Sequence, residues 1–90
     1  MGAMILRTLA IIPAHNEVKN LCQVLAEIRG TGLNLDVLVV DDHSSDETAL
    51  AAAQEGARVL RLPCNLGYGG AVQAGFRYAV HYGYDYGAPM

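Results

Sequence analysis

Two adjacent carboxylates, Asp41 and Asp42, directly follow the apolar run of residues 37–40. A continuous β-branched run bounded by turn residues predicts a strand that is buried on both faces, as in a parallel sheet. Ligands of open α/β sheets bind at the carboxyl ends of the strands, where the loops leave a crevice and helices present their N-termini. The position of the acidic pair therefore makes it a candidate ligand-binding site.

The chain around this pair alternates between strand and helix patterns. Residues 9–12 and 58–62 predict two more strands, and a proline follows each. Helical patterns follow all three strands and end near Gly30, Gly56 and Gly83. This alternation predicts a Rossmann-like, three-layer α/β/α fold with a parallel sheet in the order 3-2-1.

Two consequences of this strand order concern the first strand. Its outer edge is expected to be uncovered, and a free apolar edge favours a homodimer through the strand-one edge of each copy. Residues 84–86 resemble the start of a fourth strand, but Gly87, Ala88 and Pro89 are expected to turn the chain away.

Short polar residues between the strands and helices are expected to cap the helices. Asn16 is predicted to cap the first helix, and the spacing of Ser44 and Glu47 predicts a capping box for the second. Asp46 and Glu47 are interpreted as capping residues. The loop histidines, His15 among them, are expected to be solvated.

Composition limits the classes of protein to consider. Ninety residues predict a single domain over residues 1–90, and a net charge of −3 argues against a nucleic-acid or anionic-membrane partner. No apolar run approaches the roughly 18 to 20 residues of a membrane span, so a soluble, cytoplasmic protein is expected. Cys22 and Cys64 fit free thiols. Residues 1–3 resemble a cloning remnant.

Three segments, taken together, resemble the N-terminal part of family 2 glycosyltransferases. They are residues 11–17 (IIPAHNE), 39–48 (VVDDHSSDET) and 65–71 (NLGYGGA). The resemblance covers residues 8–86 and is greatest to the polyprenol- or dolichol-phosphate mannosyl- and glucosyltransferases. It implies the nucleotide-binding half of a GT-A fold, which binds a UDP- or GDP-sugar and would here be truncated.

The resemblance also implies roles for individual residues. It places Pro13, Ala14, Asn16 and Glu17 in the nucleoside pocket, with Glu17 near the ribose. Asp41 and Asp42 correspond to the segment that reads the base, where a carboxylate accepts a hydrogen bond from a ring N–H. The glycines Gly67 and Gly69 would allow a close approach of the backbone to a ligand or of a helix to the sheet.

Two departures from the family pattern affect these expectations. His43 stands where the family usually has glycine, so the loop is expected to be less free to adopt a positive φ. The Asp-x-Asp motif that holds Mg²⁺ or Mn²⁺ in full-length family members does not occur in these 90 residues. Sugar transfer needs the charge on the leaving diphosphate neutralised, so no catalytic residue, metal ligand or cofactor is assigned to this chain.

The resulting hypothesis is a nucleotide-sugar-binding part of a glycosyltransferase that is inactive alone. One alternative is a non-catalytic α/β module that forms a homo-oligomer. Another is a binder of NAD or S-adenosylmethionine, against which the first strand leads to PAHNE and not to a Gly-x-Gly-x-x-Gly turn.

Overall fold

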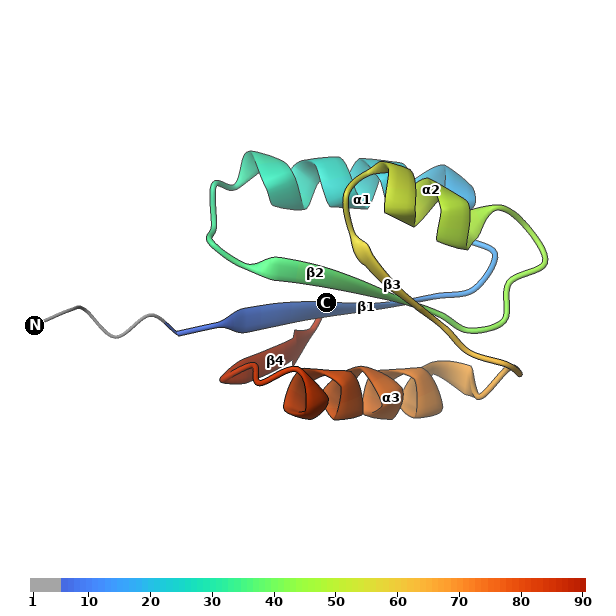
Figure 1. The fold of residues 1–90 in the computed structure, drawn as a ribbon. Helices are drawn as coiled ribbons and strands as arrows, with labels where there is room; N and C mark the ends of the chain where they lie inside the picture. Colours follow the sequence, from blue (N-terminus) through green and yellow to red (C-terminus); the bar gives the residue numbers. More distant parts are fainter. Residues whose placement is uncertain (1–5) are drawn as a thin grey trace, which may run out of the picture.

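The computed structural model describes residues 6–90 and shows a parallel sheet between two layers of helices (Figure 1). Residues 1–3, interpreted as a cloning remnant, lie outside the described residues. The elements in chain order are β1 (Thr8–Ala14), α1 (Val18–Gly30), β2 (Asp36–Asp41), α2 (Thr48–Gln54), β3 (Arg58–Arg61), α3 (Gly67–His81) and β4 (Tyr86–Pro89).

All strand pairs are parallel, and the sheet order is β3-β2-β1-β4. The predicted α/β class and the order 3-2-1 are therefore confirmed. The expectation of an open strand-one edge is wrong, because β4 pairs with β1 from Thr8↔Tyr86 to Ile11↔Pro89. The reason for expecting a homodimer through the β1 edge is thereby removed.

Strands β1 and β4 each contain a proline and still extend further than expected, because neither proline interrupts a ladder bond. The N–H groups of Tyr86 and Met90 donate to β1, so alternation along β4 turns the nitrogen of Pro89 outward. In β1 the Ile11 carbonyl faces β4, and alternate residues face the same side. The ring of Pro13 therefore faces the space beyond the last β4 pair, and β1 continues to Ala14.

Side chains of the central strands alternate between the two faces of the sheet. Leu9, Ile11, Leu38 and Val40 are buried on the α3 face, where Ala71 and Ala79 pack against them. On the other face α1 and α2 cover the sheet; the buried residues there include Ile12, Val39, Leu21, Leu25 and Ala52. The strand and helix periodicities thus account for both halves of the core.

Arg7, the residue before β1, holds the start of β4 in place. The Asp85 Oδ2 accepts from the Arg7 N–H at 2.7 Å, while the Asp85 N–H donates to the Arg7 carbonyl at 2.8 Å. The Arg7 guanidinium lies 4.3 Å from the centre of the Tyr84 ring. The Tyr84 hydroxyl donates to Asp36, and burial together with this bond raises the pKa of Tyr84.

Helix α3 lies close to the sheet because Gly75 has no side chain. A Cβ at Gly75 would lie 2.4 Å from the Cγ2 of Ile11. The close packing of α3 against β1 therefore depends on the absence of a side chain at position 75. The glycine that matters most is Gly75, whereas a Cβ at Gly69 would meet no atom within 4 Å.

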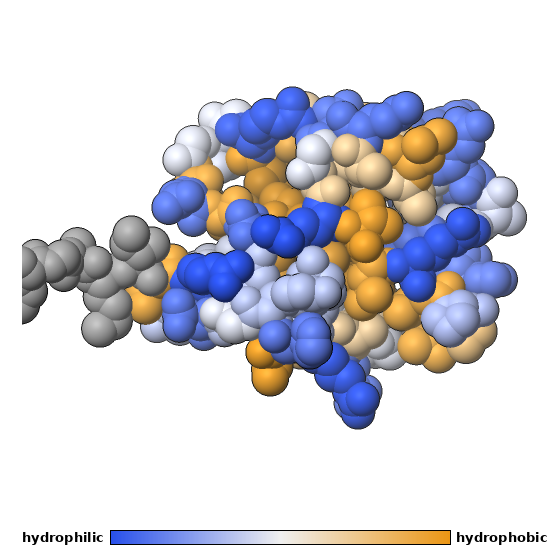
Figure 2. Space-filling view, in the orientation of Figure 1, coloured by the Kyte–Doolittle hydropathy of each residue, from blue (hydrophilic) through white to orange (hydrophobic). Residues whose placement is uncertain are grey.

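The surface shown in Figure 2 carries apolar patches that are interrupted by hydrophilic side chains. Five of the exposed large apolar residues lie in or next to α3: Leu66, Tyr68, Phe76, Val80 and Tyr82. Among the described helices, none has the length and apolarity required to cross a membrane.

Candidate functional site

The three strand-to-helix loops lie together at one end of the molecule, on the right in Figure 1. We call this end the carboxyl edge. It comprises the carboxyl ends of β1, β2 and β3 and the loops of residues 15–17, 42–47 and 62–66. All of the residues predicted to bind a ligand lie on it or at the start of α3.

Asn16 joins the first loop to the second. Its Oδ1 accepts hydrogen bonds from the Ser45 N–H at 2.9 Å, the Ser45 hydroxyl at 3.2 Å and the Asp46 N–H at 3.3 Å. Its own N–H donates to the Ser44 hydroxyl at 2.9 Å. The prediction that Asn16 caps α1 is wrong, because its side chain is engaged across the two loops and the N-cap residue is Glu17.

Thr48 and Asp46 accept the hydrogen bonds at the starts of the first two helices. The Glu17 N–H donates to the Thr48 hydroxyl, so a residue of α2 satisfies the start of α1. The Asp46 Oδ1 accepts from the Thr48 N–H at 2.9 Å and from the Thr48 hydroxyl. The hydrogen bond from the Thr48 hydroxyl lowers the pKa of Asp46. Asp46 thus caps α2 as expected.

The predicted capping box of Ser44 and Glu47 does not form. Helix α2 has Glu47 as its N-cap residue without a side-chain capping bond. The Ser44 hydroxyl accepts from the Asn16 N–H, and the Ser44 N–H donates to Asp41 Oδ1 at 3.0 Å. The Ser44 hydroxyl thus bonds to Asn16 of the first loop and not to the start of α2. The local spacing of Ser44 and Glu47 does not reveal this partner.

Asp42 holds the start of α3. Its Oδ1 accepts from the Leu66 N–H at 2.7 Å and its Oδ2 from the Gly67 N–H at 2.9 Å. Only 4% of the residue is exposed. Because helix N-termini carry unsatisfied N–H groups and a partial positive charge, the carboxylate is stabilised there.

Asp41 is engaged within the protein as well. It is 1% exposed, accepts from the Ser44 N–H, and its Oδ2 lies 3.6 Å from the Arg61 Nε. Arg61 also lies 3.4 Å from the Ser44 carbonyl through Nη2. The two acidic side chains are therefore buried and bonded at the carboxyl edge, and neither extends into solvent.

Three predicted residues line one hollow beside β1. Pro13, Ala14 and Glu17 contribute to a space of about 240 Å³, and it is completed by Ile12, Asn20, Leu21, Val24 and Met90. The hollow is largely apolar, and Glu17 is the acidic residue that lines it. The Glu17 carboxylate accepts from Asn20 Nδ2 at 3.3 Å. An apolar wall with one carboxylate suits a ring and a hydroxyl-bearing sugar.

The structure separates the predicted residues into two groups. One group lines this hollow; the other, Asp41, Asp42 and Asn16, holds the loops together. Gly67 has a φ of +79°, which glycine adopts without strain, and its N–H is bonded to Asp42. Gly69 is exposed and has no close neighbour.

His43 adopts the positive φ that a glycine would take at this position. Its φ is +59°, although a side chain there was expected to hinder that conformation. The loop geometry set by Asp41, Ser44 and Asn16 overrides the preference of the residue. The cost is backbone strain of roughly 1 kcal/mol.

Sequence reasoning missed His15, Asn65 and Arg61 as parts of the carboxyl edge. The His15 Nδ1 lies 2.8 Å from the Asp42 carbonyl and 3.3 Å from Asn65 Nδ2. His15 thus contacts both other loops, although it is exposed. The position of His15 between Ala14 and Asn16 in sequence was the available signal, but its partners are 27 and 50 residues away.

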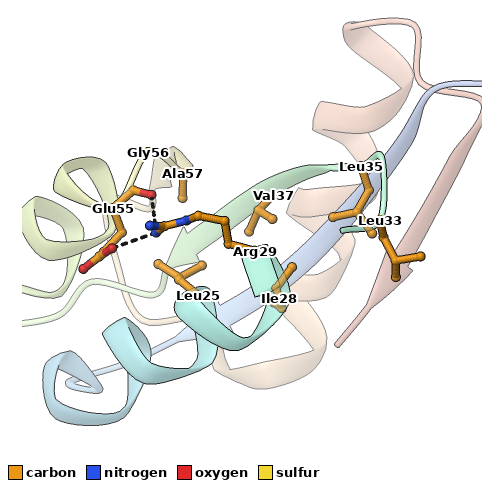
Figure 3. Close-up of a pocket in the computed structure, with 9 residues that line it drawn as sticks. All are labelled: Leu25, Ile28, Arg29, Leu33, Leu35, Val37, Glu55, Gly56 and Ala57. Carbon is orange, nitrogen blue, oxygen red and sulfur yellow. Dashed lines mark hydrogen bonds and ion pairs between the residues drawn. The ribbon is translucent and has the colours of Figure 1, made fainter. Parts of the chain in front are cut away.

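Another hollow, of about 210 Å³, lies at the opposite end of the sheet, between the end of α1 and the turn after α2 (Figure 3). The Arg29 Nη2 donates to the Glu55 carboxylate at 2.7 Å and to the Glu55 carbonyl at 3.0 Å. Its lining side chains are mostly leucine, isoleucine and valine. Its charges pair with each other, and no predicted site residue lines it.

The side chains at the carboxyl edge do not fit a divalent cation. Among residues 6–90, no three His, Cys, Asp or Glu side chains are grouped so that they could hold a metal ion. The Asp41 and Asp42 oxygens are already bonded to backbone N–H groups or face Arg61. A metal ion would compete with these partners for the same oxygens.

Residues 9–84 match the sequence model of glycosyl transferase family 2, and the chain belongs to this family. It is 41% identical over 85 residues to the undecaprenyl-phosphate mannosyltransferase of Micrococcus luteus, an alignment covering 89% of this chain and 35% of the relative. It is 33% identical to the polyprenol monophosphomannose synthase of Mycolicibacterium smegmatis, covering 88% and 32%. The chain spans about a third of the length of these relatives.

Solved structures agree with the fold. A mannosyltransferase from Pyrobaculum calidifontis, in complex with GDP-Man and Mn²⁺, superposes with a TM-score of 0.72 at 24% identity over 81% of this chain and 24% of that one. The glucosyl-3-phosphoglycerate synthase of Mycobacterium tuberculosis, in complex with UDP, gives 0.62 at 26% identity over 73% and 27%. The predicted GT-A fold is thereby confirmed.

Proposed function

We propose that this chain binds the nucleotide-sugar donor of a hexosyl transfer, with the nucleoside at the carboxyl edge. The observation that carries the proposal is the hollow lined by Pro13, Ala14 and Glu17 at the end of β1. It lies where ligands of parallel α/β sheets bind. The nucleotide complexes of the two structural neighbours support a UDP- or GDP-sugar as the ligand.

Each site residue has a proposed role that its chemistry allows. The Glu17 carboxylate accepts hydrogen bonds from the ribose hydroxyls. Each oxygen of Asp42 accepts one backbone hydrogen bond and retains a second lone pair for a ring N–H of uracil or guanine. Asp41 and Asn16 fix the second loop against the first, and Gly67 and Gly69 leave the start of α3 open to a ligand.

We propose further that the chain does not transfer sugar alone. The leaving diphosphate of a nucleotide sugar requires neutralisation by a metal or a cationic cluster. The carboxyl edge supplies neither among the described residues, since no three potential metal ligands are grouped there, Asp41 and Asp42 are bonded within the protein, and the Arg61 guanidinium faces Asp41. Mg²⁺ or Mn²⁺ is expected to act only in a full-length family member.

Titration calorimetry with uridine, guanosine, UDP-glucose and GDP-mannose tests the binding proposal. Saturable binding in the uridine or the guanosine series is expected, and Glu17→Ala should weaken it about tenfold, because a buried ligand hydroxyl loses its acceptor. Glu27→Ala is the matched control, since Glu27 is exposed on α1 outside the carboxyl edge and its carboxylate accepts from Gln23 Nε2. Absence of heat with all four ligands at millimolar concentration would remove the proposal.

Self-association is a second candidate role. Strand β4 is an edge strand of the described sheet, and its side away from β1 is unpaired. Tyr86 and Met90 are 58% and 60% exposed there. Light scattering at micromolar concentration tests it. A dimer that Tyr86→Lys converts to monomer supports this role, and a wild-type monomer counts against it.

A further inference from the structure

We infer that this chain recognises the nucleoside part of its ligand and disfavours the phosphates, so that affinity without a divalent cation falls from nucleoside to monophosphate to diphosphate. This inference rests on the proposed function and names the part of the nucleotide that the carboxyl edge accepts. It follows from two independent features: the protein's own acceptors occupy the backbone N–H groups, and carboxylates dominate the charge.

Phosphate sites on α/β folds are built from free backbone N–H groups at loops and helix N-termini. At this carboxyl edge ten of these groups are bonded to the protein's own acceptors. The N–H groups with assigned partners are those of Asn16, Glu17, Asp42, Ser44, Ser45, Asp46, Thr48, Leu62, Leu66 and Gly67. They include residues at the start of all three helices. A phosphate that used any of these ten groups would have to displace or share an existing acceptor.

The glycine-rich start of α3 is the clearest case. The sequence Gly67-Tyr68-Gly69-Gly70 suggests a phosphate cradle, yet the Asp42 carboxylate already occupies the anion position there. The carboxylate is nine-tenths buried and bonded to two N–H groups. A phosphate oxygen at the same place would lie beside the like charge of Asp42. The repulsion between the two charges would outweigh the hydrogen bonds that the phosphate gained.

The charges along the carboxyl edge also disfavour a phosphate. The three loops and the strand ends they follow carry five carboxylates, Glu17, Asp41, Asp42, Asp46 and Glu47, against one guanidinium on Arg61. Arg61 is already paired with Asp41 at 3.6 Å. Each added phosphate therefore approaches a net negative surface, whereas a neutral nucleoside does not.

Calorimetric titration of uridine, UMP and UDP, and of guanosine, GMP and GDP, tests the inference. The buffer contains EDTA and about 20 mM salt, where screening is weak. In the series that binds, affinity should fall about two- to threefold with each added phosphate charge. About 0.5 M salt should reduce the difference, since the Debye length is then only a few ångströms.

A pair of charge variants separates electrostatics from folding. Glu47→Gln removes an exposed carboxylate that makes no capping bond, so UDP or GDP affinity should rise about twofold while nucleoside affinity stays unchanged. Glu27→Gln removes an equally exposed carboxylate on α1 outside the carboxyl edge and should change neither.

The outcomes distinguish this inference from the proposed function. Saturable nucleoside binding with weaker diphosphate binding supports both. Diphosphate binding that is tighter than nucleoside binding in EDTA overturns the inference and leaves the proposed function standing. Absence of binding throughout both series overturns both.

Discussion

The Asp42 Oδ2 lies 2.9 Å from the N–H of Gly67, the first residue of α3. A carboxylate at the end of one strand therefore anchors the helix that follows the next strand, 25 residues further along the chain. This contact connects the acidic pair to the glycine-rich segment, the two motifs that stand out most in the sequence. It also gives Asp42 a structural role beside its proposed contact with the base.

Replacing Asp42 by asparagine should destabilise the fold by about 2 to 3 kcal/mol, because one charge-assisted bond and an anion at a helix N-terminus are lost. Urea unfolding followed by circular dichroism measures the change. Glu47→Gln, which removes an exposed acid of the same edge, should stay within about 0.5 kcal/mol of wild type. Equal stability of the two variants would contradict the anchoring role.

Two variants of Asn16 separate its side-chain bonds from its backbone conformation. Asn16→Gly keeps the φ of +52° accessible but removes the acceptor of three cross-loop bonds, so a loss of about 1 to 2 kcal/mol is expected. Asn16→Ala should cost about 1 kcal/mol more, since alanine pays for the left-handed conformation. If the two variants have the same unfolding midpoint, φ at this position is not constrained.

Replacing His43 by glycine should stabilise the protein by about 0.5 to 1 kcal/mol, because the exposed residue adopts a φ of +59°. Thermal unfolding detects the gain as a rise in Tm of a few degrees. His43→Ala keeps the Cβ and therefore the strain, so it is the matched control and should bring no gain.

Replacing Gly75 by alanine should destabilise the fold by about 1 to 3 kcal/mol, because the new Cβ would lie 2.4 Å from Ile11 Cγ2. Gly69→Ala, in the same helix but with open space around it, should instead gain up to about 1 kcal/mol of helix propensity. Opposite signs in urea unfolding would confirm that α3 packs closely against β1 at Gly75. A neutral Gly75→Ala would contradict it.

The pKa of Asp46 should be lower in the folded than in the unfolded chain, because the Thr48 hydroxyl stabilises the carboxylate. A depressed folded pKa adds stability that is present above the unfolded value of about 3.9 and is lost as pH falls through the folded value. NMR titration of the Asp46 carboxyl carbon measures the shift directly. Thr48→Val should return the pKa of Asp46 toward its ordinary value.

The sequence by itself determined the fold class and the family. Valine-rich and isoleucine-rich runs define buried strands, and the helical periods between them require parallel crossovers, so the order of the first three strands follows. Such patterns are local, because each reflects which face of one element is buried. The motifs around Glu17, Asp42 and Gly67 were equally visible, since they are short and contiguous.

Only the tertiary structure decided what these polar residues contact. Asn16 bonds across 29 residues to Ser45, and Asp42 bonds across 25 to Gly67; no spacing rule relates such partners. The pairing of β4 with β1 was likewise decided by contacts of Arg7 with Asp85, 78 residues apart. Local sequence fixes the periodicity of each element, whereas hydrogen bonds between distant segments form only once the chain has packed.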